Sequence, residues 1–150
     1  MEKSIISPAY KAFLTEIKQK VYQSQYQAMR QVNEALIGLY WEIGKGIVEK
    51  QKQHNWGKSV VERLAEDLQK EFPGMQGWSM ANLWRMRKFY LTYEGDAKLA
   101  RLVREIGWGH NVVIFEKAKQ NVVRHFYITM CRYYGWTRDA LADQMDLKLH

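Results

Sequence analysis

The side chains of this chain best suited to chemistry are three neighbouring cations, Arg85, Arg87 and Lys88. They lie in a run whose apolar spacing predicts a helix over residues 79–93. Guanidinium and ammonium groups bind phosphate oxygens and base edges, so a basic helix of this kind can contact DNA. Lys58, at the start of the preceding predicted helix, is a fourth candidate contact. A solvated face without any ligand has the same composition, and periodicity favours neither interpretation.

The predicted basic helix has a core face and an opposite side that faces solvent. Its core face is expected to comprise four residues: Leu83, Met86, Tyr90 and Tyr93. Asn82 lies near this face, so its amide is expected to make a buried hydrogen bond. The opposite side carries Arg85 and Lys88, with Arg87 toward its edge, and is expected to contain no carboxylate.

A predicted helix over residues 59–71 precedes the basic helix, so the two form a helix-turn-helix-like pair. In DNA-binding pairs of this kind the second helix enters a groove of the duplex. The connection from Phe72 to Trp78 is longer than the standard turn of about 3–4 residues, which counts against that function.

Catalytic and metal-binding patterns are not found in the rest of the sequence. Five residues lack the spacing of metal ligands: His54, His110, His125, His150 and Cys131. The run Gly44-Lys45-Gly46 has no preceding strand and lacks the full pattern of a phosphate loop, so these glycines, with Gly38, are expected to allow close helix packing. Glu16-Ile17-Lys18 matches half of a nuclease motif but lies in a predicted helix. The sequence therefore predicts no enzyme activity, no metal and no cofactor.

Composition indicates a folded protein with a basic surface. The hydrophobic fraction is 47%, the charged fraction is 26% and the formal net charge is +7. Residues 1–75 contribute +2 and residues 76–150 contribute +5, so the excess begins near the basic helix and favours nucleic acid as a partner. A lone cysteine, no membrane-length apolar run and no signal-peptide core predict a cytoplasmic protein with no membrane partner.

A long amphipathic helix is predicted over residues 8–54. Ser7-Pro8 is a typical start, with an N-cap followed by proline at the first helical position. Apolar residues then recur on one face: Tyr10, Leu14, Ile17, Val21, Ala28, Val32, Leu36, Leu39, Ile43 and Ile47. The polar run 23–25 leaves one helix and two helices as alternatives.

Four tryptophans each precede an acceptable N-cap residue: Trp56-Gly57, Trp78-Ser79, Trp108-Gly109 and Trp136-Thr137. An aliphatic residue follows each tryptophan after five positions, which is the spacing of a hydrophobic staple at a helix start. These tryptophans are therefore interpreted as anchors of helix starts, with Ser59 and Glu62 as a rival capping box for the first. The predicted helices are 8–54, 59–71, 79–93, 96–106, 110–118, 120–134 and 137–147.

The expected fold is an all-α, multi-helix domain with a long N-terminal helix, or helix pair, and a helix-turn-helix-like pair. We expect a single domain over 1–150, made of a long helical arm over 1–54 and a compact helical part over 56–150.

Four runs in this order resemble a known bacterial family: LIGLYWEIGKGIVEKQ, WGKSVVERLAEDLQKEFPGMQGWSMANLWRMRKFY, IGWGHNVVIFEKAKQ and HFYITMCRYYGWTRDALADQM. They resemble the N-terminal domain of the YhcG-like proteins, a domain of unknown function, from about Tyr10 to Met145. Members of that family usually continue into a nuclease domain of the PD-(D/E)xK type. The resemblance implies a helical targeting module for a DNA-acting nuclease, and it transfers no catalytic residue because the nuclease motifs are not in this chain.

Two functions from different classes follow. The favoured one is a non-catalytic nucleic-acid-binding module that contacts duplex DNA through the helix over 79–93. The alternative is a protein-interaction or dimerisation domain, because an apolar stripe of some 40 residues is longer than a small monomer needs. Both can hold in one homo-oligomer, since DNA-binding helix pairs are often dimeric.

Overall fold

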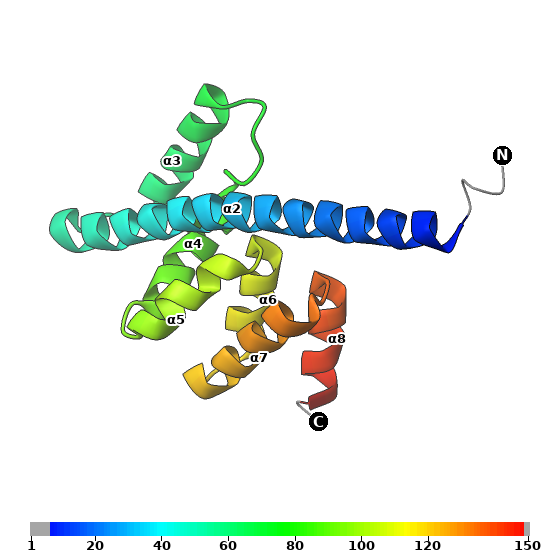
Figure 1. The fold of residues 1–150 in the computed structure, drawn as a ribbon. Coiled ribbons are helices and arrows are strands. Elements are labelled where there is room, and N and C mark those ends of the chain that lie inside the picture. The colour runs from blue at the N-terminus through cyan, green and yellow to red at the C-terminus, as the bar shows by residue number, and fades with distance from the viewer. Residues whose placement is uncertain (1–6, 149–150) are drawn as a thin grey trace. The chain divides into compact units, whose positions relative to one another are not determined.

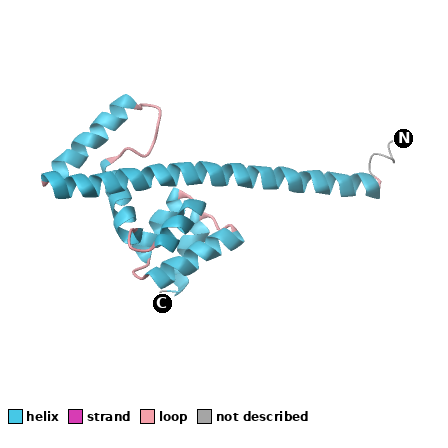
Figure 2. Ribbon diagram, turned by 60° about the vertical axis from the view of Figure 1, so that its left-hand side comes forward, coloured by secondary structure: helices cyan, strands magenta, loops and turns pink. Residues whose placement is uncertain are grey.

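The structure is a computed structural model that describes residues 7–148. Over this part of the chain it contains α-helices, one short 3-10 helix and no strand (Figures 1 and 2). The elements are α2 (Pro8–His54), α3 (Lys58–Glu71), α4 (Met80–Tyr93), α5 (Ala97–Leu102), η1 (Val103–Glu105), α6 (Trp108–Lys117), α7 (Asn121–Tyr134) and α8 (Arg138–Lys148). The predicted all-α fold is confirmed. No helix among these residues is long and apolar enough to cross a membrane.

Residues Pro8–His54 form one continuous helix of 47 residues, α2, so the polar run 23–25 does not break it. By its packing the chain nevertheless divides into two units, between Val32 and Asn33. Residues 33–54 of α2 thus belong to the same compact unit as the helices that follow. The single-domain organisation over 1–150 stays a prediction.

The first unit, the N-terminal arm (residues 8–32), has no core of its own. Every residue from Pro8 to Val32 is exposed. Nine of its large apolar side chains are between 37% and 66% exposed: Tyr10, Phe13, Leu14, Ile17, Val21, Tyr22, Tyr26, Met29 and Val32. An arm of this kind buries too little apolar surface to stabilise itself by packing.

The second unit has two adjoining apolar clusters. One is built around Phe89, Phe115 and Ile128, and the other around Leu83, Met86 and Trp78. Trp108 packs against both clusters. Its ring lies edge-on to the rings of Tyr40 and Phe89, at centroid distances of 4.9 Å and 5.2 Å. One aromatic ring therefore joins the two halves of the core.

Helix starts follow the predicted caps at three of four tryptophans. Gly57 is the N-cap of α3, and the hydroxyls of Ser79 and Thr137 each accept a backbone N–H at 3.1 Å at the starts of α4 and α8. The fourth prediction is wrong, because α6 begins at Trp108 with Gly107 as its N-cap. Trp108 is the first residue of α6, and from this position its ring packs against both core clusters.

Trp56 precedes α3 as predicted and lies beside Val60 and Val61 of its first turn, but it is not buried. Its side chain is 41% exposed and its ring stacks on His54 at 5.2 Å. Trp78, by contrast, is buried, and the amide of Gln69 donates to its carbonyl at 2.9 Å.

Close packing of α2 on α4 depends on one glycine. A Cβ at Gly44 would lie 2.1 Å from the carbonyl oxygen of Met86, which no side chain can tolerate. A Cβ at Gly38 would meet only the flexible end of Arg104, and one at Gly46 would meet nothing within 4 Å. The predicted role of the glycines in close helix packing is therefore confirmed at Gly44.

The core face of α4 is shifted from the predicted one. Its buried residues are Leu83, Met86, Phe89 and Tyr93, whereas Tyr90 is half-buried. Phe89 is buried because it faces Trp108 and Phe115 of α6, a neighbour that the periodicity of α4 alone does not reveal. Tyr90 instead lies edge-on to Trp41 at 5.1 Å.

Candidate nucleic-acid interface

The first turn of α4 is held by a chain of polar contacts. The side-chain amide of Asn82 donates to the carbonyl of Gly77 at 2.9 Å, and its oxygen accepts from the indole Nε1 of Trp108 at 2.8 Å. The predicted hydrogen bonding of Asn82 is therefore confirmed, in a partly buried setting. Gly77 has φ +103°, and a Cβ there would lie 2.4 Å from the hydroxyl of Tyr40. These contacts fix the direction in which α4 presents its basic side.

Arg85 of α4 is exposed but has an acidic partner. Its Nε lies 3.3 Å from Oε1 of Glu116 on α6, and the two side chains are 45% and 43% exposed. The prediction that this side of α4 contains no carboxylate is therefore wrong. The reason is that the acid comes from another helix, 31 positions along the chain. An ion pair this exposed is weak and can exchange its partner.

Lys88 lies one turn beyond Arg85 on the same side of α4. It is exposed, and its ammonium is 5.7 Å from the centre of the buried Phe115 ring. Both Arg85 and Lys88 therefore lie beside α6, and together they form the basic edge of α4 (Arg85 and Lys88). Lys88 is exposed despite this contact, so an anion in solution can reach it.

Arg87 and Lys58 do not join the basic edge. The Nε of Arg87 donates to Oε1 of Gln51 on α2 at 2.7 Å, and its guanidinium lies 5.5 Å from the centre of the Trp84 ring. Arg87 is half-buried and links α4 to α2. Lys58 is exposed at the first residue of α3, on a different helix.

Candidate metal ligands are not gathered at any site within residues 7–148. No group of three or more His, Cys, Asp or Glu side chains in this range could hold a metal ion. Burial raises the pKa of the Cys131 thiol to about 12, which keeps it in the unreactive neutral form. The Nε2 of His110 lies 2.6 Å from the carbonyl oxygen of Trp136, a contact between helix ends. His150 lies outside the described residues.

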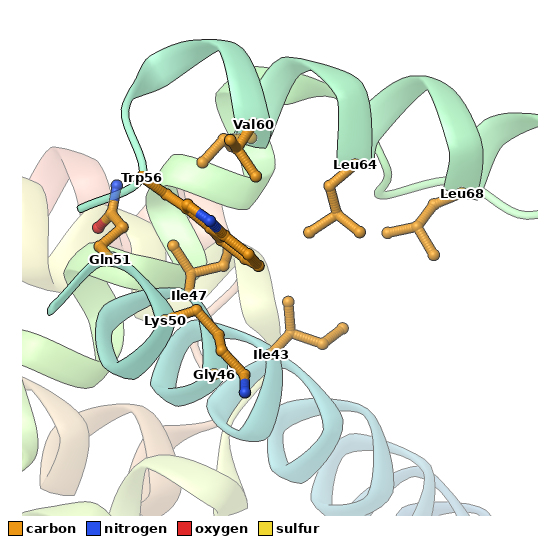
Figure 3. Close-up of a pocket in the computed structure, with 10 residues that line it drawn as sticks. Ile43, Gly46, Ile47, Lys50, Gln51, Trp56, Val60, Leu64 and Leu68 are labelled. Carbon is orange, nitrogen blue, oxygen red and sulfur yellow. The ribbon is translucent and has the colours of Figure 1, made fainter. Parts of the chain in front are cut away.

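Sequence reasoning missed an apolar groove in the second unit, between α2 and α3. The α2–α3 groove has a volume of about 280 Å³ and is lined by Ile43, Gly46, Ile47, Lys50, Gln51, Trp56, Val60, Val61, Leu64 and Leu68. Figure 3 shows Val60, Leu64 and Leu68 of α3 pointing toward α2, with the Trp56 ring beside them. The signal in the sequence was the apolar face of residues 60–68, but a pattern does not show whether a face is covered.

Comparison with known proteins gives one result. A protein-family model described as the DUF1016 N-terminal domain matches residues 16–150. This is the YhcG-like N-terminal domain family, so the resemblance seen in the four sequence runs is confirmed. The curated proteins and the solved structures contain no match.

Proposed function

The chain belongs to the DUF1016 N-terminal domain family, and on that premise we propose that it is a non-catalytic assembly and targeting module of a nuclease-associated protein. The YhcG-like proteins that it resembles usually carry a nuclease domain after this one. Assembly through the N-terminal arm is the function best supported by the geometry. Contact with nucleic acid through α4 is a second candidate with its own supporting observation.

The observation that carries assembly is the exposed apolar surface of the N-terminal arm. Apolar side chains repeat along 25 residues of helix, and none of them is buried. Monomeric soluble proteins rarely expose contiguous apolar patches above a few hundred Å², and larger patches mark interaction surfaces. Residues spaced three and four apart on a helix are the pattern by which helices pair. A second copy of the chain supplies further apolar surface against which the arm can pack.

Light scattering at increasing concentration tests this proposal. The wild type is expected to exceed the monomer mass of 17.8 kDa, and Ile17→Glu with Val21→Glu should return it to a monomer, because two charges would enter the contact. The matched control is Gln19→Glu with Gln23→Glu, which adds the same charge on the other side of the arm. A wild type that stays monomeric at high micromolar concentration, or equal dissociation by both pairs, contradicts the proposal.

The observation that favours nucleic acid is the exposure of Arg85 and Lys88 side by side on α4. They lie in the half of the chain that contributes +5 to the net charge. Arg85 already forms an ion pair with Glu116, but both side chains are exposed. A phosphate can therefore replace the carboxylate as the partner of the guanidinium. Arg87, held by Gln51, would position α4 and would not bind the ligand itself.

The test is fluorescence anisotropy with duplex DNA at several salt concentrations. Arg85→Ala with Lys88→Ala should weaken binding to all duplexes and flatten the dependence of log affinity on log salt by about 1–2 units, at about 0.9 per phosphate contact. Lys98→Ala with Arg101→Ala, two exposed cations of α5, removes the same charge elsewhere and is the control. If both double variants lose affinity equally, or neither does, α4 is not the contacting helix.

A further inference from the structure

We infer that the α2–α3 groove receives the N-terminal arm of a second copy of this chain. The inference rests on the proposed assembly through the arm and names the surface against which the arm packs. In a two-fold dimer each copy would then give one arm and accept one.

The α2–α3 groove is open because α3 buries only part of its apolar face. Val61 and Ala65 are buried, whereas Val60, Leu64 and Leu68 stay half-exposed and point into the groove. Trp56 lines the groove and is itself exposed (Figure 3). A cavity of about 150 Å³ can hold one benzene ring, so a groove of about 280 Å³ has room for one or two large apolar side chains.

The arm offers side chains of the right kind and spacing for this groove. Phe13 and Ile17 lie one helical turn apart, and both are exposed. The facing row on α3, formed by Val60, Leu64 and Leu68, has the same spacing of four residues. Apolar rows with equal spacing can interdigitate when two helices pack.

The arm also has the same repeat as the floor of the groove. Three series of positions spaced 11 residues apart along α2 are apolar except at Gln25 and Lys50: Tyr10, Val21, Val32 and Ile43; Leu14, Gln25, Leu36 and Ile47; Ile17, Ala28, Leu39 and Lys50. An 11-residue repeat corresponds to about 3.67 residues per turn, so such a stripe stays on one side of a nearly straight helix. The arm thus has apolar residues at the helical positions that Ile43 and Ile47 occupy in the second unit. There Ile43 and Ile47 pack in one cluster with Val61 and Ala65 of α3.

Charge favours the same pairing. The arm (residues 8–32) has four cations, Lys11, Lys18, Lys20 and Arg30, against one anion, Glu16. Helix α3 has four anions, Glu62, Glu66, Asp67 and Glu71, against three cations. One cation, Lys50 of α2, also lines the groove. The acids of α3 can still attract the cations of the arm, whereas two arms, each with an excess of cations, repel one another.

A second copy is the occupant because the arm and the groove floor belong to one helix. Helix α2 runs unbroken from Pro8 to His54. A chain could place its own arm in its own groove only by breaking that helix.

Cross-linking between two differently tagged full-length chains tests the inference. One chain carries Phe13→Cys and the other carries Leu64→Cys, and a short bifunctional maleimide is added to the mixture. The expected result is a covalent dimer containing both tags. The control replaces Phe13→Cys by Gln19→Cys, on the other side of the arm, and should yield at least about 5-fold less of that product. Native Cys131 is buried, so it should not react.

A second measurement distinguishes packing of the arm in the α2–α3 groove from self-association through the arm in general. Leu64→Glu should weaken self-association at least about 10-fold by light scattering, and Val60→Glu is tested with it in case either variant loses helix content by circular dichroism. An unchanged mass in the folded variants, together with no mixed cross-link, overturns the groove while assembly through the arm stands. A wild type that is monomeric throughout overturns both.

Discussion

At the scale of single residues, the Arg85–Glu116 ion pair sets how much positive charge α4 presents. Glu116→Gln should raise affinity for duplex DNA about 2–5-fold at low salt, because the competing carboxylate would be removed and an exposed pair is worth about 0.2–1 kcal/mol. Anisotropy titration measures the change. Asp146→Asn, which frees Lys117, is the matched control with the same change in net charge. An equal gain in affinity in both variants would show that the net charge of the protein causes the change. No gain in Glu116→Gln would show that the basic edge of α4 does not contact DNA.

The residue scale also shows what periodicity can and cannot predict. It correctly placed Arg85 and Lys88 on the exposed side of α4. It could not give their partners, because Glu116 is 31 positions from Arg85 and Gln51 is 36 positions from Arg87. Helical spacing relates residues within one helix, whereas these contacts depend on how three helices pack.

At the scale of elements, substitution by alanine is expected to have opposite effects on stability at Gly44 and at Gly46. Gly44→Ala should lower the free energy of unfolding by about 1–3 kcal/mol or more, because its Cβ would overlap the backbone of α4. Gly46→Ala, where a Cβ meets nothing, should leave stability unchanged or raise it by up to about 1 kcal/mol through helix propensity. Urea unfolding followed by circular dichroism compares them. Similar stabilities for the two variants would show that α2 and α4 can separate without cost.

Helix boundaries were largely predictable because short-range capping determines them. Ser79 and Thr137 cap α4 and α8 through hydroxyls that accept an N–H three residues later, as their sequence positions indicated. At α6 the neighbouring residues Gly107 and Gly109 are both acceptable caps. Burial of Trp108 between two core clusters favoured Gly107, and that choice depends on tertiary packing.

At the scale of the whole molecule, two buried acids should make stability fall at high pH. Burial raises the pKa of Cys131 from 9.0 to about 12 and raises the pKa of Tyr93 above its ordinary 10.0. Both groups are neutral in the fold, so their contribution to stability is constant below pH 9 and falls as pH rises toward 12, first through Cys131 and then also through Tyr93. The slope is at most about 1.4 kcal/mol per pH unit for each group.

Urea unfolding at intervals from pH 7 to pH 11 measures this loss. Cys131→Ala should remove the decline between pH 9 and pH 10, where the thiol alone among the two would titrate. A decline that is unchanged in this variant would assign the alkaline sensitivity to other groups.

Helix α2 is continuous in its hydrogen bonds but belongs to two units with very different packing, and this has a consequence for exchange of its amide hydrogens. From Asn33 to Val48, opening an amide to solvent requires loss of the core, so exchange should be slow. From Pro8 to Val32 it requires only local fraying of an uncovered helix, so exchange in dilute protein should be fast. The protection of one helix would then change abruptly in its middle. If a second copy covers the arm, that step should disappear as the protein concentration rises, and the concentration at which it does so would measure the affinity between copies.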